Sequence, residues 1–260
     1  MANAVLIDTS KCTACRGCQV ACKQWNQLPA EKTTNRGSYE NPASLSSKTW
    51  TKVTFKETSN EGNPEWLFAK TQCMHCTDAT CVRVCPTGAA QKTELGAVII
   101  DQKECTGCRF CVENCPFEVP QYDETTNTAK KCRLCYDRIS NGLGPACAKT
   151  CPTGAVQFGE RDQLVSSGKE RVSSLTEKGL TNANLYGDTQ LDGLGVMYVL
   201  TQKPASYGLP EDPKVPPSAV LWQDILKPVG AIAGGATLVA LIASFVANLG
   251  YKPDTPKGGK

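Results

Sequence analysis

The stretch CTGCRFCVENCP, residues 105–116, decides the fold of this 260-residue sequence. Its four cysteines follow the spacing C-x2-C-x2-C-x3-C, and Pro116 follows the fourth. The same spacing recurs between Cys12 and Cys22, where Lys23 takes the place of the proline. Three cysteines within seven residues cannot pair with one another as disulfides, because a disulfide requires two Cα atoms at a suitable distance and angle. The stretch therefore indicates a site that uses several thiolates together.

The sequence contains sixteen cysteines, and all of them lie between Cys12 and Cys151. They form group one (12–22), group two (73–85), group three (105–115) and group four (132–151). Groups two and four have wider spacings, C-x2-C-x4-C-x3-C-P and C-x2-C-x11-C-x3-C-P. The compact spacing of groups one and three is the bacterial ferredoxin pattern, in which the fourth cysteine reaches a different cluster from the first three. Sixteen thiolates therefore predict four [4Fe–4S] clusters as cofactors.

Two other uses of the cysteines would give a different class of protein. Zinc sites usually take two separated C-x2-C pairs, which groups two and four could supply but groups one and three could not. An even cysteine count also keeps a disulfide framework open. A structural module held by zinc or disulfides is therefore the alternative from another class. His75 is the only histidine, so the chain offers neither a histidine-rich metal site nor two histidine ligands for a haem.

Short repeats show that the groups are related in pairs. Residues 4–8 and 97–101 are apolar, β-branched runs that precede the two compact groups at the same offset, and such runs are typical of strands. Cys-Pro-Thr-Gly-Ala occurs both at residues 85–89 and at residues 151–155. We therefore expect a duplicated unit of two cysteine groups, with short strands leading into the cluster loops. Spacing alone leaves open which group lends its fourth cysteine to which cluster.

Charge and motifs exclude several classes of function. Lys and Arg number 28 against 25 Asp and Glu, a formal net charge of +3, whereas nucleic-acid binding requires basic residues gathered on one face. The sequence has no G-x-G-x-x-G loop, P-loop or G-x-S-x-G elbow. We therefore expect no nucleic-acid partner, no substrate site and no catalytic residue in this chain. Basic residues beside the cysteines are placed to offset cluster charge. They are Arg16, Arg83, Lys103, Arg109, Lys131 and Arg133.

The C-terminal part contains an uncharged run of 24 residues from Pro228 to Tyr251. As a helix it would be about 36 Å long, which exceeds the roughly 30 Å hydrocarbon core of a bilayer. Lys227 and Lys252 flank the run, and Trp222 and Tyr251 suit the two membrane interfaces. The sequence therefore predicts one transmembrane helix and the lipid bilayer as a partner.

Charges around this helix predict its orientation. Lysines outnumber acidic residues after the helix, whereas the segment before it mixes both signs. The positive-inside rule then puts the C-terminus in the cytoplasm and the clusters in the periplasm. Met1 leads at once into a strand and Cys12 without a signal peptide, so we expect the folded cluster region to be exported on a partner's signal. The expected location is the inner membrane, crossed once.

These observations predict an α+β protein with two ferredoxin-like domains of two [4Fe–4S] clusters each, an extended proline-rich arm and a single C-terminal transmembrane helix. Several prolines between residues 203 and 217 indicate an arm without a packed core of its own. The expected boundaries are 1–160 for the cluster domains, 161–218 for a polar linker and the arm, 219–252 for the anchor helix, and 253–260 for a cytoplasmic tail.

The chain resembles the beta, or iron–sulfur, subunit of membrane-bound respiratory formate dehydrogenase over nearly its whole length. The resemblance rests on the x4 and x11 spacings, both Cys-Pro-Thr-Gly-Ala runs, Cys-Tyr-Asp-Arg at 135–138, the arm at 198–210, Trp222 and Lys227-Pro228. It implies a non-catalytic electron-transfer subunit with two partners, a catalytic molybdopterin alpha subunit holding Mo or W and a membrane cytochrome b gamma subunit that reduces quinone. The same role in a membrane hydrogenase, or in a polysulfide, thiosulfate or sulfoxide reductase, is the alternative within this class.

The resemblance also implies how the groups share clusters. Groups one and four form one ferredoxin-like domain, and groups two and three form the other. The two domains are then interleaved within residues 1–160, with 23–72 and 66–120 as insertions between groups one and four. Each cluster takes three cysteines from one group and the fourth from the other group of its domain. The implied ligands are Cys12, Cys15, Cys18 and Cys151 for cluster 1; Cys73, Cys76, Cys81 and Cys115 for cluster 2; Cys105, Cys108, Cys111 and Cys85 for cluster 3; and Cys132, Cys135, Cys147 and Cys22 for cluster 4.

Overall fold

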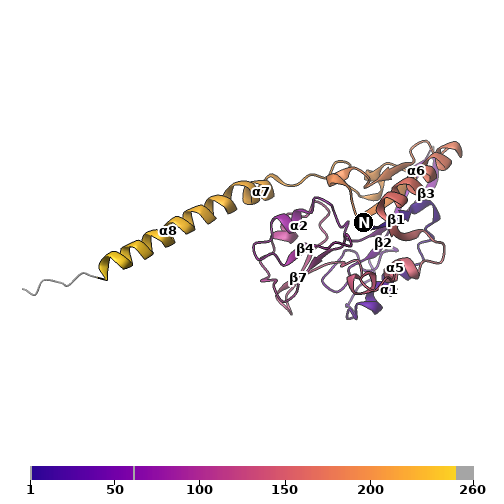
Figure 1. The fold of residues 1–260 in the computed structure, drawn as a ribbon. Coiled ribbons are helices and arrows are strands. Elements are labelled where there is room, and N and C mark those ends of the chain that lie inside the picture. Colours follow the sequence, from indigo (N-terminus) through magenta and orange to yellow (C-terminus); the bar gives the residue numbers. More distant parts are fainter. Residues whose placement is uncertain (1, 61, 250–260) are drawn as a thin grey trace, which may run out of the picture. The chain divides into compact units, whose positions relative to one another are not determined.

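The computed structural model describes residues 2–60 and 62–249, and the chain divides into two compact units (Figure 1). The first unit comprises residues 1–216 and holds every cysteine. The second comprises residues 217–260 and holds the predicted membrane helix. The predicted cytoplasmic tail, 253–260, lies outside the described residues.

A four-stranded sheet organises the first unit. Its strands, in spatial order, are β8 (Val156–Glu160), β1 (Asn3–Asp8), β10 (Val196–Leu200) and β9 (Asn184–Tyr186). β1 runs parallel to β10, with Val5 opposite Val196, and antiparallel to β8. All five residues of β10 are buried, which is typical of a strand whose sheet is covered on both faces.

The interpretation of residues 161–218 as a polar linker and an extended arm is wrong for much of that range. Helix α6 (Arg161–Glu177) contacts β1, β8, β9 and β10 and covers one face of the sheet (Figure 1). Leu164 and Leu175 of α6 pack with Leu6 of β1 in one buried cluster. β10 lies between β1 and β9. These residues therefore belong to the core of the first unit.

The polar composition of α6 concealed its helical pattern. Its sequence is rich in Ser, Arg and Glu, but the buried residues Leu164, Gly168 and Leu175 recur at helical spacing. A Cβ on Gly168 would lie 2.8 Å from Leu185 Cδ1, so a residue without a side chain lets the helix approach the sheet closely. The run Val196–Leu200 is apolar at each position, which is typical of a fully buried strand.

Short hairpins and short helices surround the cysteine groups. The hairpins pair β2 (Lys52–Asn60) with β3 (Asn63–Thr71), β4 (Ala90–Lys92) with β5 (Val98–Ile100), and β6 (Gln121–Asp123) with β7 (Thr128–Lys130). The helices are α1 (Gly17–Trp25), α2 (Thr80–Arg83), α3 (Phe110–Glu113), α4 (Tyr136–Ile139) and α5 (Ala146–Lys149). β1 and β5 confirm the strands predicted at residues 4–8 and 97–101, and the mixture of short elements confirms the α+β class.

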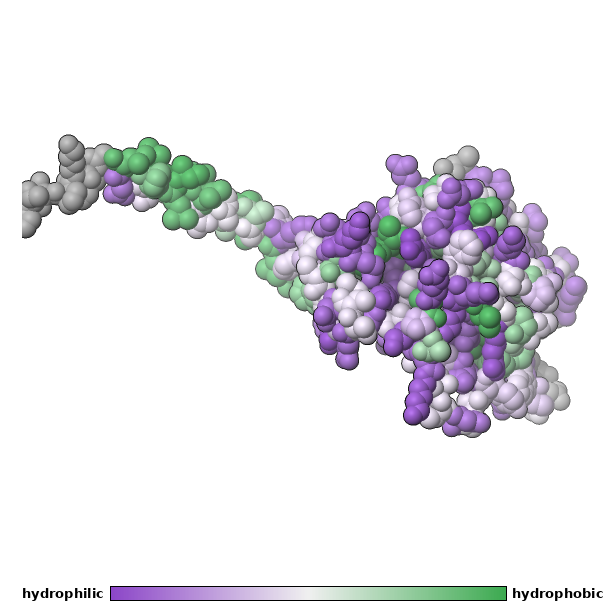
Figure 2. All heavy atoms as spheres, turned by 90° about the horizontal axis from the view of Figure 1, so that it is seen from below, coloured by the Kyte–Doolittle hydropathy of each residue, from purple (hydrophilic) through white to green (hydrophobic). Residues whose placement is uncertain are grey.

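The second unit is helical. Its elements are α7 (Pro217–Val220), η4 (Leu221–Leu226) and α8 (Lys227–Asn248). α8 has 22 residues and is long and apolar enough to cross a membrane, since its length is about 33 Å at 1.5 Å per residue. Every residue of α8 is exposed, and Figure 2 shows apolar side chains along it. The described helix ends at Asn248, whereas the predicted limits Tyr251 and Lys252 lie outside the described residues.

A charge in the middle of α8 is expected to weaken membrane attachment. Replacing Leu238 by Arg places a guanidinium near the helix centre, where insertion costs about 2.5–3.5 kcal/mol. We expect a smaller share of the chain in the membrane fraction after an alkaline wash. Leu238→Ile is the matched control and should stay with the membranes. Equal retention of the two variants would contradict a membrane role for α8.

Candidate iron–sulfur cluster sites

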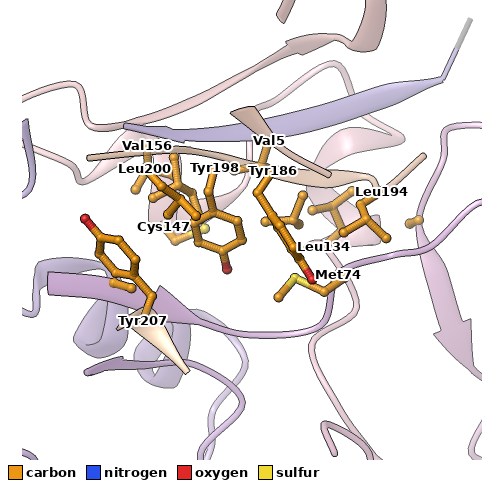
Figure 3. Packing of buried hydrophobic residues seen from close by; sticks show 14 of the residues in the cluster. Val5, Met74, Leu134, Cys147, Val156, Tyr186, Leu194, Tyr198, Leu200 and Tyr207 are labelled. Atoms are coloured by element: carbon orange, nitrogen blue, oxygen red, sulfur yellow. The ribbon is translucent and has the colours of Figure 1, made fainter. Parts of the chain in front are cut away.

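One face of the sheet packs against the loops of groups two and four. Tyr198 of β10 and Tyr186 of β9 extend from the sheet toward Met74 and Leu134 (Figure 3). Met74 belongs to group two and Leu134 to group four, and both are buried. The Tyr198 hydroxyl donates to the backbone carbonyl of Lys70 at 2.7 Å. The sheet therefore holds in place the loops of groups two and four.

Short helices bring the cysteine groups together in two pairs. α1 carries Cys18 and Cys22 of group one, and it contacts α5, which carries Cys147 of group four. α2 carries Cys81 of group two, and it contacts α3, which carries Cys111 of group three. Group one therefore lies with group four, and group two lies with group three. The resemblance implies this same arrangement.

A mostly enclosed cavity lies between groups one and four, and we call it the first cavity. The empty space inside it is about 320 Å³ when the gaps between atoms and the opening to solvent are counted. The cysteines that line it are Cys22, Cys132, Cys135 and Cys147, and all of these are buried. Lys70, Gln72 and Trp50 form part of its wall. These cysteines are the ones predicted for cluster 4.

The second cavity lies between groups two and three and has a similar size. Its empty space, counted in the same way, is about 350 Å³. The cysteines that line it are Cys73, Cys76, Cys81 and Cys115. Cys73 and Cys81 are buried, and Cys76 and Cys115 are partly buried. Its wall also contains Thr80 and Lys131. These cysteines are the ones predicted for cluster 2.

The remaining cysteines form two sets nearer the surface. Electrostatic interactions between neighbouring thiols link one set, Cys12, Cys15, Cys18 and Cys151. Interactions of the same kind link the other set, Cys85, Cys105, Cys108 and Cys111. Each set has one exposed cysteine, Cys15 in the first and Cys108 in the second. The two sets contain the cysteines predicted for clusters 1 and 3, so the structure brings all sixteen predicted residues into four sets.

Two buried polar atoms in the cavity walls fit an iron–sulfur cluster. Gln72 Nε2 and Thr80 Oγ1 have no hydrogen-bond partner in the described chain. Their side chains line the first and second cavity respectively. The sulfurs of a bound cluster would be acceptors for both atoms.

Burial makes the inner thiolates costly unless positive charge is near. Burial raises the pKa of the Cys22 thiol to about 12, and Lys70 acts in the opposite direction. Burial also raises the pKa of Cys81 to about 12, and there Lys131 opposes it. A metal ligand must be the thiolate rather than the thiol. Iron and these two lysines are therefore the positive charges that would keep the inner cysteines ionised.

His75 is a buried neutral side chain within group two. It is 1% exposed, and its Nδ1 accepts a hydrogen bond from the backbone N–H of Val98 at 2.9 Å. Burial lowers the pKa of His75 well below its ordinary value, and the positive charges of Lys131 and Lys70 lower it further. The neutral imidazole therefore ties the loop of group two to strand β5.

Left-handed backbone conformations turn the ligand loops. Arg16 and Arg109 occupy equivalent positions in the two compact groups, with φ of 60° and 64°. His75, between two cysteines of group two, has φ of 49°, and its N–H donates to Cys73 Sγ at 3.4 Å. Such N–H donors stabilise negative charge on sulfur. The loops therefore place both sulfurs and hydrogen-bond donors around each site.

A side chain at Gly107 is expected to disrupt the loop of group three. Gly107 has φ of +71°, and a Cβ there would lie 2.3 Å from the carbonyl oxygen of Asn127. Gly107→Ala should therefore cost the iron of cluster 3, measured by iron content per chain. Gly142→Ala is the matched control, because Gly142 has φ of +72° but open space around it. The control should suffer only the backbone strain of about 1–2 kcal/mol, and equal iron in the two variants would contradict the prediction.

Sequence patterns did not single out Lys70, Gln72 or Thr80, although all three line the cavities. Lys131 was among the basic residues noted beside the cysteines. Lys70 lies in β3 and is 2% exposed, whereas Lys56 in the partner strand β2 is exposed. Nothing in the local sequence distinguishes these two lysines, since the burial of Lys70 depends on how distant segments pack around it.

Three family models match the chain. Two models described as 4Fe-4S dicluster domains match residues 11–89 and 64–161. A third, described as the formate dehydrogenase N transmembrane domain, matches residues 215–247. The dicluster matches overlap across group two, so they show two dicluster domains without deciding which cysteines share a cluster. The third match covers α8 and shows that the chain is anchored in a membrane.

Comparison with individual proteins shows the family. The chain is 42% identical to the nitrate-inducible formate dehydrogenase iron–sulfur subunit of Escherichia coli, over 94% of this chain and 84% of that protein. It is also 42% identical to the formate dehydrogenase iron–sulfur subunit of Haemophilus influenzae, over 94% of this chain and 80% of that protein. One polypeptide of the anaerobic dimethyl sulfoxide reductase of Escherichia coli is 38% identical over 61% of this chain and 73% of that protein. Because the formate dehydrogenase relatives match both the cysteine groups and the C-terminal part, the chain belongs to the family of formate dehydrogenase iron–sulfur subunits.

Proposed function

We propose that this chain conducts electrons through four [4Fe–4S] clusters between two partner subunits. The donor is a catalytic molybdopterin subunit, with Mo or W, that oxidises formate. The acceptor is a membrane cytochrome b subunit that reduces quinone. Bound clusters supply one-electron redox centres, while the residues of this chain hold the clusters, space them and exclude water from the inner two.

A continuous series of neighbouring cysteine sets supports this proposal most directly. Neighbouring sets lie close enough for their thiols to interact electrostatically, and the interacting pairs include Cys18–Cys147, Cys132–Cys73 and Cys81–Cys111. The clusters would then follow the order 1, 4, 2, 3. The exposed cysteines, Cys15 and Cys108, belong to the two ends of this series. One end can therefore face the donor subunit and the other end the acceptor subunit.

The clusters on this proposal lie on the periplasmic side of the inner membrane. The lysines that follow α8 in the sequence, against the single Asp254, support a cytoplasmic C-terminus. Protease added to spheroplasts should then digest the first unit. Protection of the first unit in intact spheroplasts, with digestion after lysis, would refute this orientation.

The decisive experiment is performed on the native complex purified from membranes. We expect about four clusters' worth of iron per chain, an electron paramagnetic resonance (EPR) signal after dithionite reduction, and formate-dependent reduction of a soluble dye. Zinc in place of iron, with no EPR signal, would overturn the cluster assignment. Cluster signals without formate activity would overturn the formate-oxidising partner, and dimethyl sulfoxide-dependent reoxidation would then indicate a reductase of the type that shares the cysteine region.

A further inference from the structure

Of the three buried lysines in the described part of the first unit, Lys52 pairs with Glu40, whereas Lys70 and Lys131 have no carboxylate partner. Lys70 is 2% exposed and Lys131 is 4% exposed, although a lysine is almost never buried without a charged partner. In the described part of the chain, neither forms an ion pair with a carboxylate. Lys70 Nζ donates to Gln72 Oε1, and Lys131 Nζ donates to the backbone carbonyls of Val98 and Cys132. These neutral oxygens satisfy hydrogen bonds but leave two buried positive charges without a carboxylate.

Each of the two lysines lines a cavity formed by cysteine groups other than the group that follows it in the sequence. Lys70 precedes group two in the sequence, yet it lines the first cavity, between groups one and four. Lys131 immediately precedes group four, yet it lines the second cavity, between groups two and three. A lysine shortly before group two therefore lines the cavity of group four, and the lysine before group four lines the cavity of group two. Lys131 also interacts with both Cys73 and Cys132, so it lies where the two cavities adjoin.

Buried clusters and exposed clusters differ in how easily they accept an electron. A cluster with four thiolate ligands is anionic, and reduction adds a further negative charge. Burial disfavours that added charge, because low polarity stabilises charge poorly. The outer sets border water at Cys15 and Cys108, whereas all the cysteines of the first cavity are buried. A nearby buried cation offsets this difference, since charges interact strongly away from water.

We propose that Lys70 and Lys131 set the potentials of the inner clusters, Lys70 by raising that of the cluster in the first cavity and Lys131 by raising that of the cluster in the second. The lysines keep the two inner clusters, 4 and 2, easy to reduce. Burial of these clusters then does not block electron flow between clusters 1 and 3. This inference rests on the proposed assignment of clusters 4 and 2. The position of Lys70 supports it, because this lysine lines the first cavity together with Cys22, Cys132, Cys135 and Cys147.

The test is a potentiometric titration of the purified complex, followed by EPR. Lys70→Met and Lys131→Met remove the charge and keep a similar chain length. Each should lower the equilibrium constant for reduction of its cluster about tenfold or more, which is about 59 mV for a one-electron couple. Cys22→Ala and Cys81→Ala assign the EPR signals, because the signal that changes in each variant belongs to cluster 4 or to cluster 2 respectively. Lys70→Arg and Lys131→Arg keep the charge and should restore the potentials, and the exposed Lys178→Met is the control for a remote charge.

The outcomes separate this inference from the proposed function. Unchanged potentials in both methionine variants, with iron content intact, would overturn the role of the lysines and leave the electron path standing. If methionine prevents cluster assembly, Lys70→Gln and Lys131→Gln are titrated instead under the same criterion. Loss of a cluster in the methionine and glutamine variants, with the cluster retained in the arginine variant, supports the proposal that the lysine offsets the charge of that cluster. Loss of that cluster in the arginine variant as well would assign the lysine to packing and overturn the proposal.

Discussion

Replacing Cys108 by Ala is expected to stop formate-dependent quinone reduction while formate-dependent reduction of a soluble dye continues. Cys108 belongs to the outer set at one end of the series, where it is exposed. Loss of a ligand should cost at least as much as loss of an outer-shell partner, which lowers metal affinity or activity about 10–100-fold. We therefore expect quinone reduction to fall by about two orders of magnitude. The dye takes electrons at the catalytic subunit, upstream of the lost cluster.

The control for this variant lies in the same loop. Thr106 is exposed and sits between Cys105 and Cys108, so Thr106→Ala should change neither activity nor iron content. EPR should show one cluster altered in Cys108→Ala and none in Thr106→Ala. Quinone reduction at the wild-type rate by Cys108→Ala, with that cluster demonstrably lost, would show that electrons do not pass along a single linear path.

Replacing Val199 by Asp is expected to prevent stable folding of the first unit. Val199 is fully buried in β10 and packs in the cluster that α6 forms with the sheet. A carboxylate there has no partner, and burial of an unpaired charge is among the mutations that cost more than about 4 kcal/mol. We expect the yield of assembled, iron-containing complex to collapse. Any complex that does form should unfold at a markedly lower temperature.

Ser173→Asp is the matched control, because Ser173 lies on α6 but is exposed. Its unfolding temperature should stay close to that of the wild type, since exposed substitutions usually change stability by less than about 0.5 kcal/mol. If Val199→Asp assembled and unfolded like Ser173→Asp, residues 196–200 would not belong to the core. The pair of variants therefore tests the difference between a linker and a central strand.

The cysteine sites could be predicted from sequence because their chemistry is local. Three cysteines spaced C-x2-C-x2-C can face one cluster only through a tight turn, and the turn shows directly in the spacing. The strands before Cys12 and Cys105 are also local patterns of apolar residues. Membrane crossing by α8 was predictable for the same reason, since length and composition decide it.

The features that escaped prediction depend on contacts between distant segments. Residues 196–200 are a short apolar run, and nothing near them in the sequence reveals that β1 is their partner. Lys70 and Lys131 each line a cavity formed by cysteine groups other than the one that follows them in the sequence. A basic residue beside a ligand in the sequence therefore gives no indication of which cavity it lines. Composition also misled at α6, where the polar residues outnumber a narrow apolar stripe. At α6 the spacing of the apolar residues carried more information than their proportion.

The pairing of β1 with β10 has a consequence for how the protein is made. Thr9 Oγ1 donates to the carbonyl of Val199 at 2.9 Å, across 190 residues of sequence. Such a distant contact forms slowly, because the entropy of closing a long loop is lost before the contact contributes. The first strand must wait for the ribosome to deliver the third strand of its sheet, and every cysteine is synthesised in that interval. All sixteen cysteines are therefore synthesised, and available to bind iron, before β1 can pair with β10.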